Sequence, residues 1–183
     1  MVIQPDEIKS TSRDKRIMMG VWYEYCAAEH KCAMAAGLDI VYNRKQSIKQ
    51  NETITEIKHI ITSDLLSDLG KLFTKTSHND TVSLFALDIQ NNNELSKELL
   101  GIEKEYEKYK EIRDKRISHL DMDIFKKMES VEVNINEVQD LLLRIKEFIK
   151  KVYPDWKKYC EFYDFNEKRD NFEEQFDKIF KSI

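Results

Sequence analysis

Residues 94–120 read ELSKELLGIEKEYEKYKEIRDKRISHL, and their first half carries a regular hydrophobic pattern. Apolar or aromatic side chains recur there in alternating steps of four and three, which is typical of a helix that faces a partner helix. We therefore predict a long amphipathic helix that begins near Glu94. The residues of this stripe are Leu95, Leu99, Ile102, Tyr106 and Tyr109.

Two helices are predicted before this segment. An almost unbroken helical pattern runs from Asp6 to about Lys49, and its middle is rich in alanine. Because small side chains let a neighbouring helix approach closely, we expect this helix to form the spine of a bundle. Asn51 and Thr53 can cap a second helix, which ends before Ser77.

Two further helices are predicted towards the C-terminus. Asn134 and Glu137 resemble a capping box at the start of one of them, and Pro154 either stops that helix or begins the next. Asn166 can cap a last amphipathic helix. We expect an all-α chain: one domain over residues 1–183, built as a bundle of five or six helices.

Composition excludes several classes of protein. Four Gly and two Pro in 183 residues cannot supply the turns of a sandwich or barrel, and 41% hydrophobic residues exclude disorder. The net charge of −4 gives no global basic field that would attract nucleic acid, so any such contact must be local.

No signal peptide and no apolar run of about 18 residues is present, and the three Cys lack CxxC spacing, so we expect a cytoplasmic protein without membrane contact.

The apolar stripe changes character after Tyr109. The next positions in the same steps are Arg113 and Arg116, so two guanidinium groups stand on a line that was apolar for fifteen residues. Burying an unpaired charge costs several kcal/mol, which predicts a cleft, an interface or a ligand site there. The alternative is that the stripe drifts by about 20° per heptad, so that Ile112 and Ile117 enter the core and both arginines lie at its edge.

The pentapeptide RDKRI occurs twice, at residues 13–17 and 113–117. Alternating charges of this kind usually cover a solvated helix face. The first copy is followed by Met19 where the second is followed by His119. Only the second copy therefore suggests chemistry, although a lone His before an Asp is often a surface residue or a helix cap.

Residues 112–121, IRDKRISHLD, resemble the signature of the HEPN superfamily (higher eukaryotes and prokaryotes nucleotide-binding). That signature is an Arg followed by a polar residue and, after four to six intervening positions, a His. Here five residues separate Arg113 from His119, and Asp114 takes the polar place. Residues 64–73, DLLSDLGKLF, followed by VSL at 82–84, are similar to the AbiU-type branch associated with phage abortive infection. The likeness spans roughly residues 21–152, with the motif region at 94–123.

The resemblance implies a bundle of about five helices that forms a homodimer, with both motifs facing one composite cleft. Many members are metal-independent endoribonucleases, which implies an RNA substrate, no metal or other cofactor, and in some cases an antitoxin partner. In such a site His119 would transfer a proton and Arg113 would hold the scissile phosphate. Asp114 would orient either of them, and Arg116 would bind a flanking phosphate.

The chain departs from one branch of this superfamily at Asp121. Toxins paired with nucleotidyltransferase antitoxins often carry a Tyr there as the target of modification, so the resemblance does not extend to that route of regulation. Some members have lost catalysis. The alternative function is therefore a non-catalytic helical module that binds a nucleotide, RNA or a protein partner.

Two weaker groups of residues have mainly structural interpretations. Cys26, His30 and Cys32 faintly resemble a metal site, but helical spacing separates Cys32 from the others, so we expect core positions. Asp64 and Asp68 share a helix face. We expect them to be solvated or paired with Lys71, and the alternative is that one of them lines the Arg113 cleft.

Overall fold

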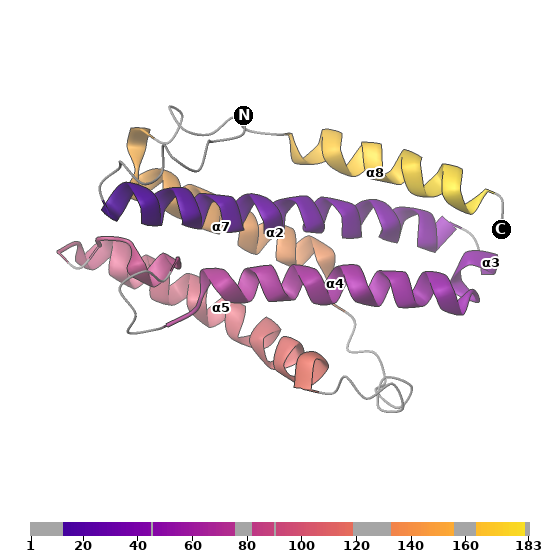
Figure 1. The fold of residues 1–183 in the computed structure, drawn as a ribbon, viewed down its shortest axis with the longest axis horizontal. Coiled ribbons are helices and arrows are strands. Elements are labelled where there is room, and N and C mark those ends of the chain that lie inside the picture. Colours follow the sequence, from indigo (N-terminus) through magenta and orange to yellow (C-terminus); the bar gives the residue numbers. More distant parts are fainter. Residues whose placement is uncertain are drawn as a thin grey trace.

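A computed structural model describes residues 13–44, 46–75, 82–89, 91–118, 133–155 and 164–181. Within these ranges the protein has five long α-helices, one four-residue α-helix and a short 3-10 helix, with no strand. The all-α bundle predicted from the hydrophobic periodicity is confirmed (Figure 1). None of the described helices is long and apolar enough to cross a membrane.

Helix α2 (Arg13–Arg44) is the spine of the bundle, as its small side chains predict. It packs against α4, α7 and α8, and Figure 1 shows it running between α8 and α4. Ala28 and Ala33 are completely buried. At Gly37 an added Cβ would lie 2.8 Å from backbone atoms of Arg169 and Glu173 in α8. The two helices therefore approach so closely that only glycine fits at this position.

The short helix α3 (Gln46–Lys49) connects α2 to α4 (Glu52–Leu72). The predicted cap of α4 is confirmed, because the side chain of Asn51 accepts a hydrogen bond from the Ile54 N–H at 3.3 Å. The helix ends at Leu72, before Ser77 as predicted. The 3-10 helix η1 (Leu84–Ala86) lies between α4 and α5.

Helix α7 (Ile135–Val152) begins at the predicted pair, but with a different set of hydrogen bonds. The Asn134 side chain accepts from the Asn136 N–H at 3.1 Å and donates its amide to Glu137 Oε1 at 3.1 Å. In a capping box the acid reaches the backbone N–H of the cap residue instead. Asn134 and Glu137 therefore predict the start of α7 correctly, although their hydrogen bonds differ from those of a capping box.

The predicted cap of helix α8 (Phe165–Phe180) is wrong. Asp164 caps this helix, since its carboxylate accepts from the backbone N–H groups of Asn166 and Glu167 at 2.8 and 3.4 Å. Asn166 itself lies inside the first turn. An Asp carboxylate also interacts favourably with the positive end of the helix dipole, which favours Asp164 as the cap.

Helix α5 (Asn93–Ser118) packs against α4 and α7. Ion pairs join α5 to α7 along their length: Glu98 to Lys151 at 2.7 Å, and the pairs Glu105–Arg144 and Lys108–Glu137. This order shows that the two helices run antiparallel. The predicted stripe faces the core, with Leu95 partly buried and four members buried: Leu99, Ile102, Tyr106 and Tyr109.

Candidate functional site

Arg113 lies near the end of α5, where this helix packs against the C-terminal part of α4. Its side chain is 23% exposed, so the guanidinium is at the edge of the core rather than in open water. It occupies the space beside Gly70 of α4. A Cβ added to Gly70 would overlap Nη1 of Arg113 and would lie 3.1 Å from its Cζ.

The guanidinium of Arg113 is held by two other side chains of α5. Asp114 Oδ1 accepts hydrogen bonds from Nε at 2.9 Å and from Nη2 at 2.7 Å, so the contact expected between Asp114 and Arg113 is present. Tyr106 Oη accepts from Nη1 at 2.9 Å. Since a guanidinium has five N–H donors, these contacts leave one N–H on Nη1 and one on Nη2 without an acceptor among the described residues.

The contact with Asp114 is not specific to this position. Arg169 makes the same two bonds to its neighbour Asp170 on α8, at 3.0 and 2.7 Å. Arg13, in the first RDKRI copy, is exposed on α2. Arg113 differs from both because it also donates to Tyr106 and lies beside Gly70.

Tyr106 is itself fixed by packing. Its ring stacks on Phe73 at the C-terminus of α4, with 4.3 Å between ring centroids and an interplanar angle of 7°. Burial raises the pKa of Tyr106, and the positive charge of Arg113 offsets only part of that effect. The phenol therefore stays neutral at neutral pH and offers Arg113 a fixed acceptor.

The two sequence-based interpretations of the stripe each describe part of this region. Ile112 is partly buried against the core and Arg113 lies at the core edge, as expected if the stripe drifts. Arg113 is nevertheless not a freely solvated side chain, because it is bonded to Tyr106. The side chains of Arg116 and Ile117 lie outside the described residues.

His119 also lies outside the described residues. The convergence of Arg113 and His119 in one site therefore stays a prediction, as does the phosphate contact of Arg116.

Asp68 is buried and bridges two lysines. Its carboxylate lies 2.8 Å from Lys31 Nζ and 2.8 Å from Lys71 Nζ. Burial alone would raise the pKa of Asp68, but the hydrogen bonds from Lys31 and Lys71 outweigh it and lower the pKa. The expected pairing with Lys71 is confirmed for Asp68, whereas Asp64 is 62% exposed and lies 3.6 Å from Lys31.

Cys26 and Cys32 have the core positions expected of them, but the same expectation is wrong for His30, which is exposed on α2 with its ring edge-on to Phe172 of α8. Cys32 is fully buried and Cys26 packs partly buried against the same core. Burial raises the pKa of Cys32 to about 12 and that of Cys26 to about 11, so neither is a reactive thiolate at neutral pH. Among the described residues, no cluster of three or more His, Cys, Asp or Glu side chains is arranged to hold a metal ion.

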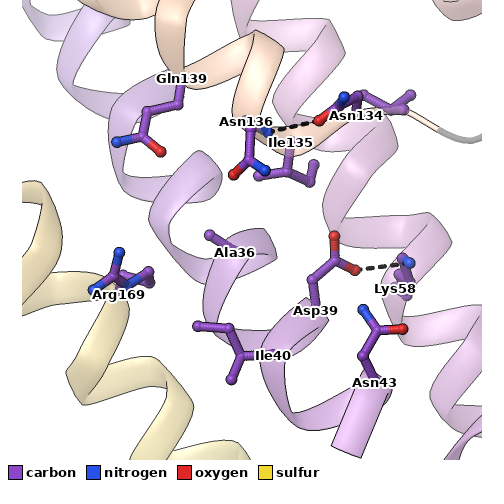
Figure 2. A pocket seen from close by; sticks show the side chains of 11 residues that line it. Ala36, Asp39, Ile40, Asn43, Lys58, Asn134, Ile135, Asn136, Gln139 and Arg169 are labelled. Atoms are coloured by element: carbon purple, nitrogen blue, oxygen red, sulfur yellow. Dashed lines mark hydrogen bonds and ion pairs between the residues drawn. The ribbon is translucent and has the colours of Figure 1, made fainter.

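A pocket of about 470 Å³ lies elsewhere, between α2, α4, α8 and the start of α7 (Figure 2). Apolar side chains, side-chain amides and charged side chains line it together. An ion pair between Asp39 and Lys58, at 2.7 Å, forms part of one wall. Arg113 does not line it. The lining residues are Ala36, Asp39, Ile40, Asn43, Lys58, Val133, Asn134, Ile135, Asn136, Gln139 and Arg169.

Sequence reasoning missed two members of the Arg113 site. The spacing of Tyr106 predicts only a core residue of the stripe. Gly70 is part of the block DLLSDLGKLF, and nothing in that block connects it to Arg113. A glycine in the interior of a predicted helix was the available signal for Gly70, since glycine there needs a packing or functional reason. No sequence signal pointed to the pocket, because four separate segments supply its lining.

Comparison of the chain with family models, with curated proteins and with solved structures gives no match.

Proposed function

We propose that this protein is a metal-independent endoribonuclease of the HEPN type, with a role in phage defence or as a toxin. The observation that carries the proposal is the environment of Arg113. It is partly buried and held by Asp114 and Tyr106, and within the described part of the chain it keeps one N–H on each Nη atom for a further acceptor. A phosphodiester offers two oxygens at a spacing that suits such a pair of donors.

The proposed reaction uses the ribose of the substrate as nucleophile. The 2′-hydroxyl oxygen attacks the adjacent phosphorus while its proton moves to a base, and the 5′-oxygen leaves with a proton from an acid. His119 serves as one of these groups, because imidazole titrates near neutral pH. Arg113 offsets the negative charge that develops on the phosphate oxygens. The products are a 2′,3′-cyclic phosphate and a 5′-hydroxyl.

Asp114 and Arg116 take supporting roles in this proposal. Asp114 accepts two hydrogen bonds from Arg113 and so limits the rotation of the guanidinium. Arg116 follows one helical turn later on α5 and would contact a flanking phosphate. Neither role depends on RNA sequence, so we expect weak sequence preference from this part of the site.

We further propose that the protein acts as a homodimer in the cytoplasm. A two-fold axis near the motif would bring two copies of Arg113 and His119 to one cleft. Light scattering at tens of micromolar should then give twice the chain mass of 21.8 kDa. An antitoxin partner would cover this cleft.

The direct test of the function is incubation of the purified protein with a short single-stranded RNA. We expect cleavage products that end in 2′,3′-cyclic phosphate. The same oligonucleotide with 2′-deoxyribose throughout should resist cleavage, because it lacks the nucleophile. Cleavage of both oligonucleotides, or of neither, would exclude the proposed chemistry.

A second candidate function is a non-catalytic binding module. The pocket of about 470 Å³ favours it, because a concave space lined by apolar residues and several amides is a common setting for a small polar ligand. Figure 2 shows Asn136 and Gln139 on the same side of this space and Arg169 facing it from α8. Failure of the RNA assay together with retention of a small metabolite by the protein would support this alternative.

A further inference from the structure

We propose that Tyr106 and Gly70 are positioning residues that set the orientation of the Arg113 guanidinium. This inference rests on the proposed function, since it states how the phosphate-binding group of that site is held. Neither residue would touch the substrate. Tyr106 supplies an acceptor at a fixed point, and Gly70 supplies the space that the guanidinium occupies.

Orientation matters because an arginine side chain is long and has many rotamers. Burial does not fix Asp114, which is 54% exposed. Tyr106 is different. It is 3% exposed and its ring stacks on Phe73, so its hydroxyl is anchored to α4 as well as to α5.

The pattern of hydrogen bonds determines which donors face outward. Asp114 accepts hydrogen bonds from the N–H of Nε and from one N–H of Nη2, and Tyr106 accepts one from an N–H of Nη1. The remaining N–H groups, one on each Nη, can bind two oxygens of one phosphate. Without the Tyr106 contact, Arg113 would keep its positive charge. Its two remaining N–H groups would no longer be held in one direction.

The presence of glycine at position 70 needs a structural reason. Gly70 lies in the last turn of α4, and glycine within a helix is less favourable than alanine. At Gly70 the reason is visible, because a Cβ would overlap Arg113 and would lie 3.1 Å from Tyr106 Oη. At Gly101, also within a helix, a Cβ would meet only Arg144 Nη2 at 3.9 Å. Gly101 is therefore a matched control for Gly70.

Tyr109 is the matched control for Tyr106. Both tyrosines are 3% exposed and belong to the same stripe of α5. The Tyr109 hydroxyl is buried, and the hydrogen bonds found for Arg113 go to Asp114 and Tyr106, so Tyr109 does not hold the guanidinium. Removing either hydroxyl changes the side chain by one atom, but only one of the two changes affects the guanidinium.

The test compares four full-length variants, Tyr106→Phe, Tyr109→Phe, Gly70→Ala and Gly101→Ala, in steady-state cleavage of the RNA oligonucleotide. Tyr106→Phe and Gly70→Ala should lower kcat by about tenfold or more with a smaller change in KM, because a misplaced group loses transition-state contacts. Tyr109→Phe and Gly101→Ala should keep kcat within about twofold of wild type. Equal kcat values within each matched pair would overturn the inference and leave the proposed function intact.

A second measurement does not depend on activity. In ¹H–¹⁵N spectra, the Arg113 side-chain signal is assigned by its loss in Arg113→Lys. We expect this signal to shift in Tyr106→Phe and in Gly70→Ala, and to stay in place in the two control variants. If the wild type cleaves no RNA, the proposed function fails, and this spectrum still decides whether Tyr106 and Gly70 hold Arg113. An unchanged signal in both variants would contradict the inference; if Gly70→Ala fails to fold, an unchanged signal in Tyr106→Phe contradicts it alone.

Discussion

Arg113 Nη1 donates a hydrogen bond to Tyr106 Oη at 2.9 Å, across seven residues of the same helix. Seven residues are about two helical turns, so the two side chains lie on one face of α5. The bond joins the first polar position of the stripe to a ring that is packed against α4. A motif residue is thereby attached to the core of the bundle.

This bond should be measurable as a coupling energy. In a double-mutant cycle of Arg113→Ala and Tyr106→Phe, we expect the two losses in free energy of unfolding to be non-additive by about 1 kcal/mol. The reason is that Arg113→Ala alone leaves the buried Tyr106 hydroxyl without this partner. Urea denaturation of the four proteins gives the value, and strictly additive losses would show that the bond contributes nothing.

Asp68 should contribute to stability in a pH-dependent manner. Its pKa is lowered in the folded state, so its contribution is present above the unfolded value of about 3.9 and is lost as pH falls through the folded pKa. Asp68→Asn should lower the free energy of unfolding at neutral pH by about 1–2 kcal/mol and weaken its fall in acid.

The control for this prediction is Asp64→Asn, since Asp64 is 62% exposed. Its effect should stay below about 0.5 kcal/mol. Urea unfolding at several pH values between neutrality and about 3 tests both variants. Identical pH profiles for Asp68→Asn and wild type would contradict the role assigned to the bridge.

The contact between α2 and α8 makes Gly37 sensitive to substitution. Gly37→Ala should lower the melting temperature, because its Cβ would press on backbone atoms of α8 at 2.8 Å, and overpacking of this kind costs about 1–3 kcal/mol. Gly101→Ala should raise it slightly, since alanine is the better helix former and meets nothing closer than 3.9 Å. Opposite shifts in a thermal melt are the expected result, and a stable Gly37→Ala would mean that the helices are farther apart.

The sequence was most informative where structure depends on local pattern. The stripe from Leu95 to Tyr109 and the cap at Asn51 follow from helical periodicity and from the hydrogen bonding of a single side chain, so both were predictable. The cap of α8 was not. Asp164 and Asn166 are both good capping residues, and they lie two positions apart.

The candidate site was predictable only in part, for a different reason. Arg113 and Asp114 are neighbours in sequence, so their contact could be anticipated. The place of Gly70 depends on how α4 crosses α5, and no local pattern encodes that crossing. Tyr106 has the same spacing as any core residue of the stripe, and its bond to Arg113 becomes visible only when the rotamers are known.

Metal independence is a further prediction of the proposed mechanism. Proton transfer by His119 and phosphate binding by Arg113 need no divalent ion. EDTA should therefore leave the rate of RNA cleavage unchanged within about twofold. Loss of cleavage in EDTA that Mg²⁺ or Mn²⁺ restores would contradict the mechanism and would point to a contaminating or metal-dependent nuclease.

The most direct test of the central claim is the rate of RNA cleavage by His119→Ala, Arg113→Ala and their double variant, with Arg13→Ala as control. Each single variant should lose about a hundredfold or more in rate, and the double variant should lose little beyond that, because the two residues act in one step. Arg13→Ala changes the exposed copy of the same pentapeptide and should cleave like wild type. Cleavage that persists in His119→Ala would contradict the account.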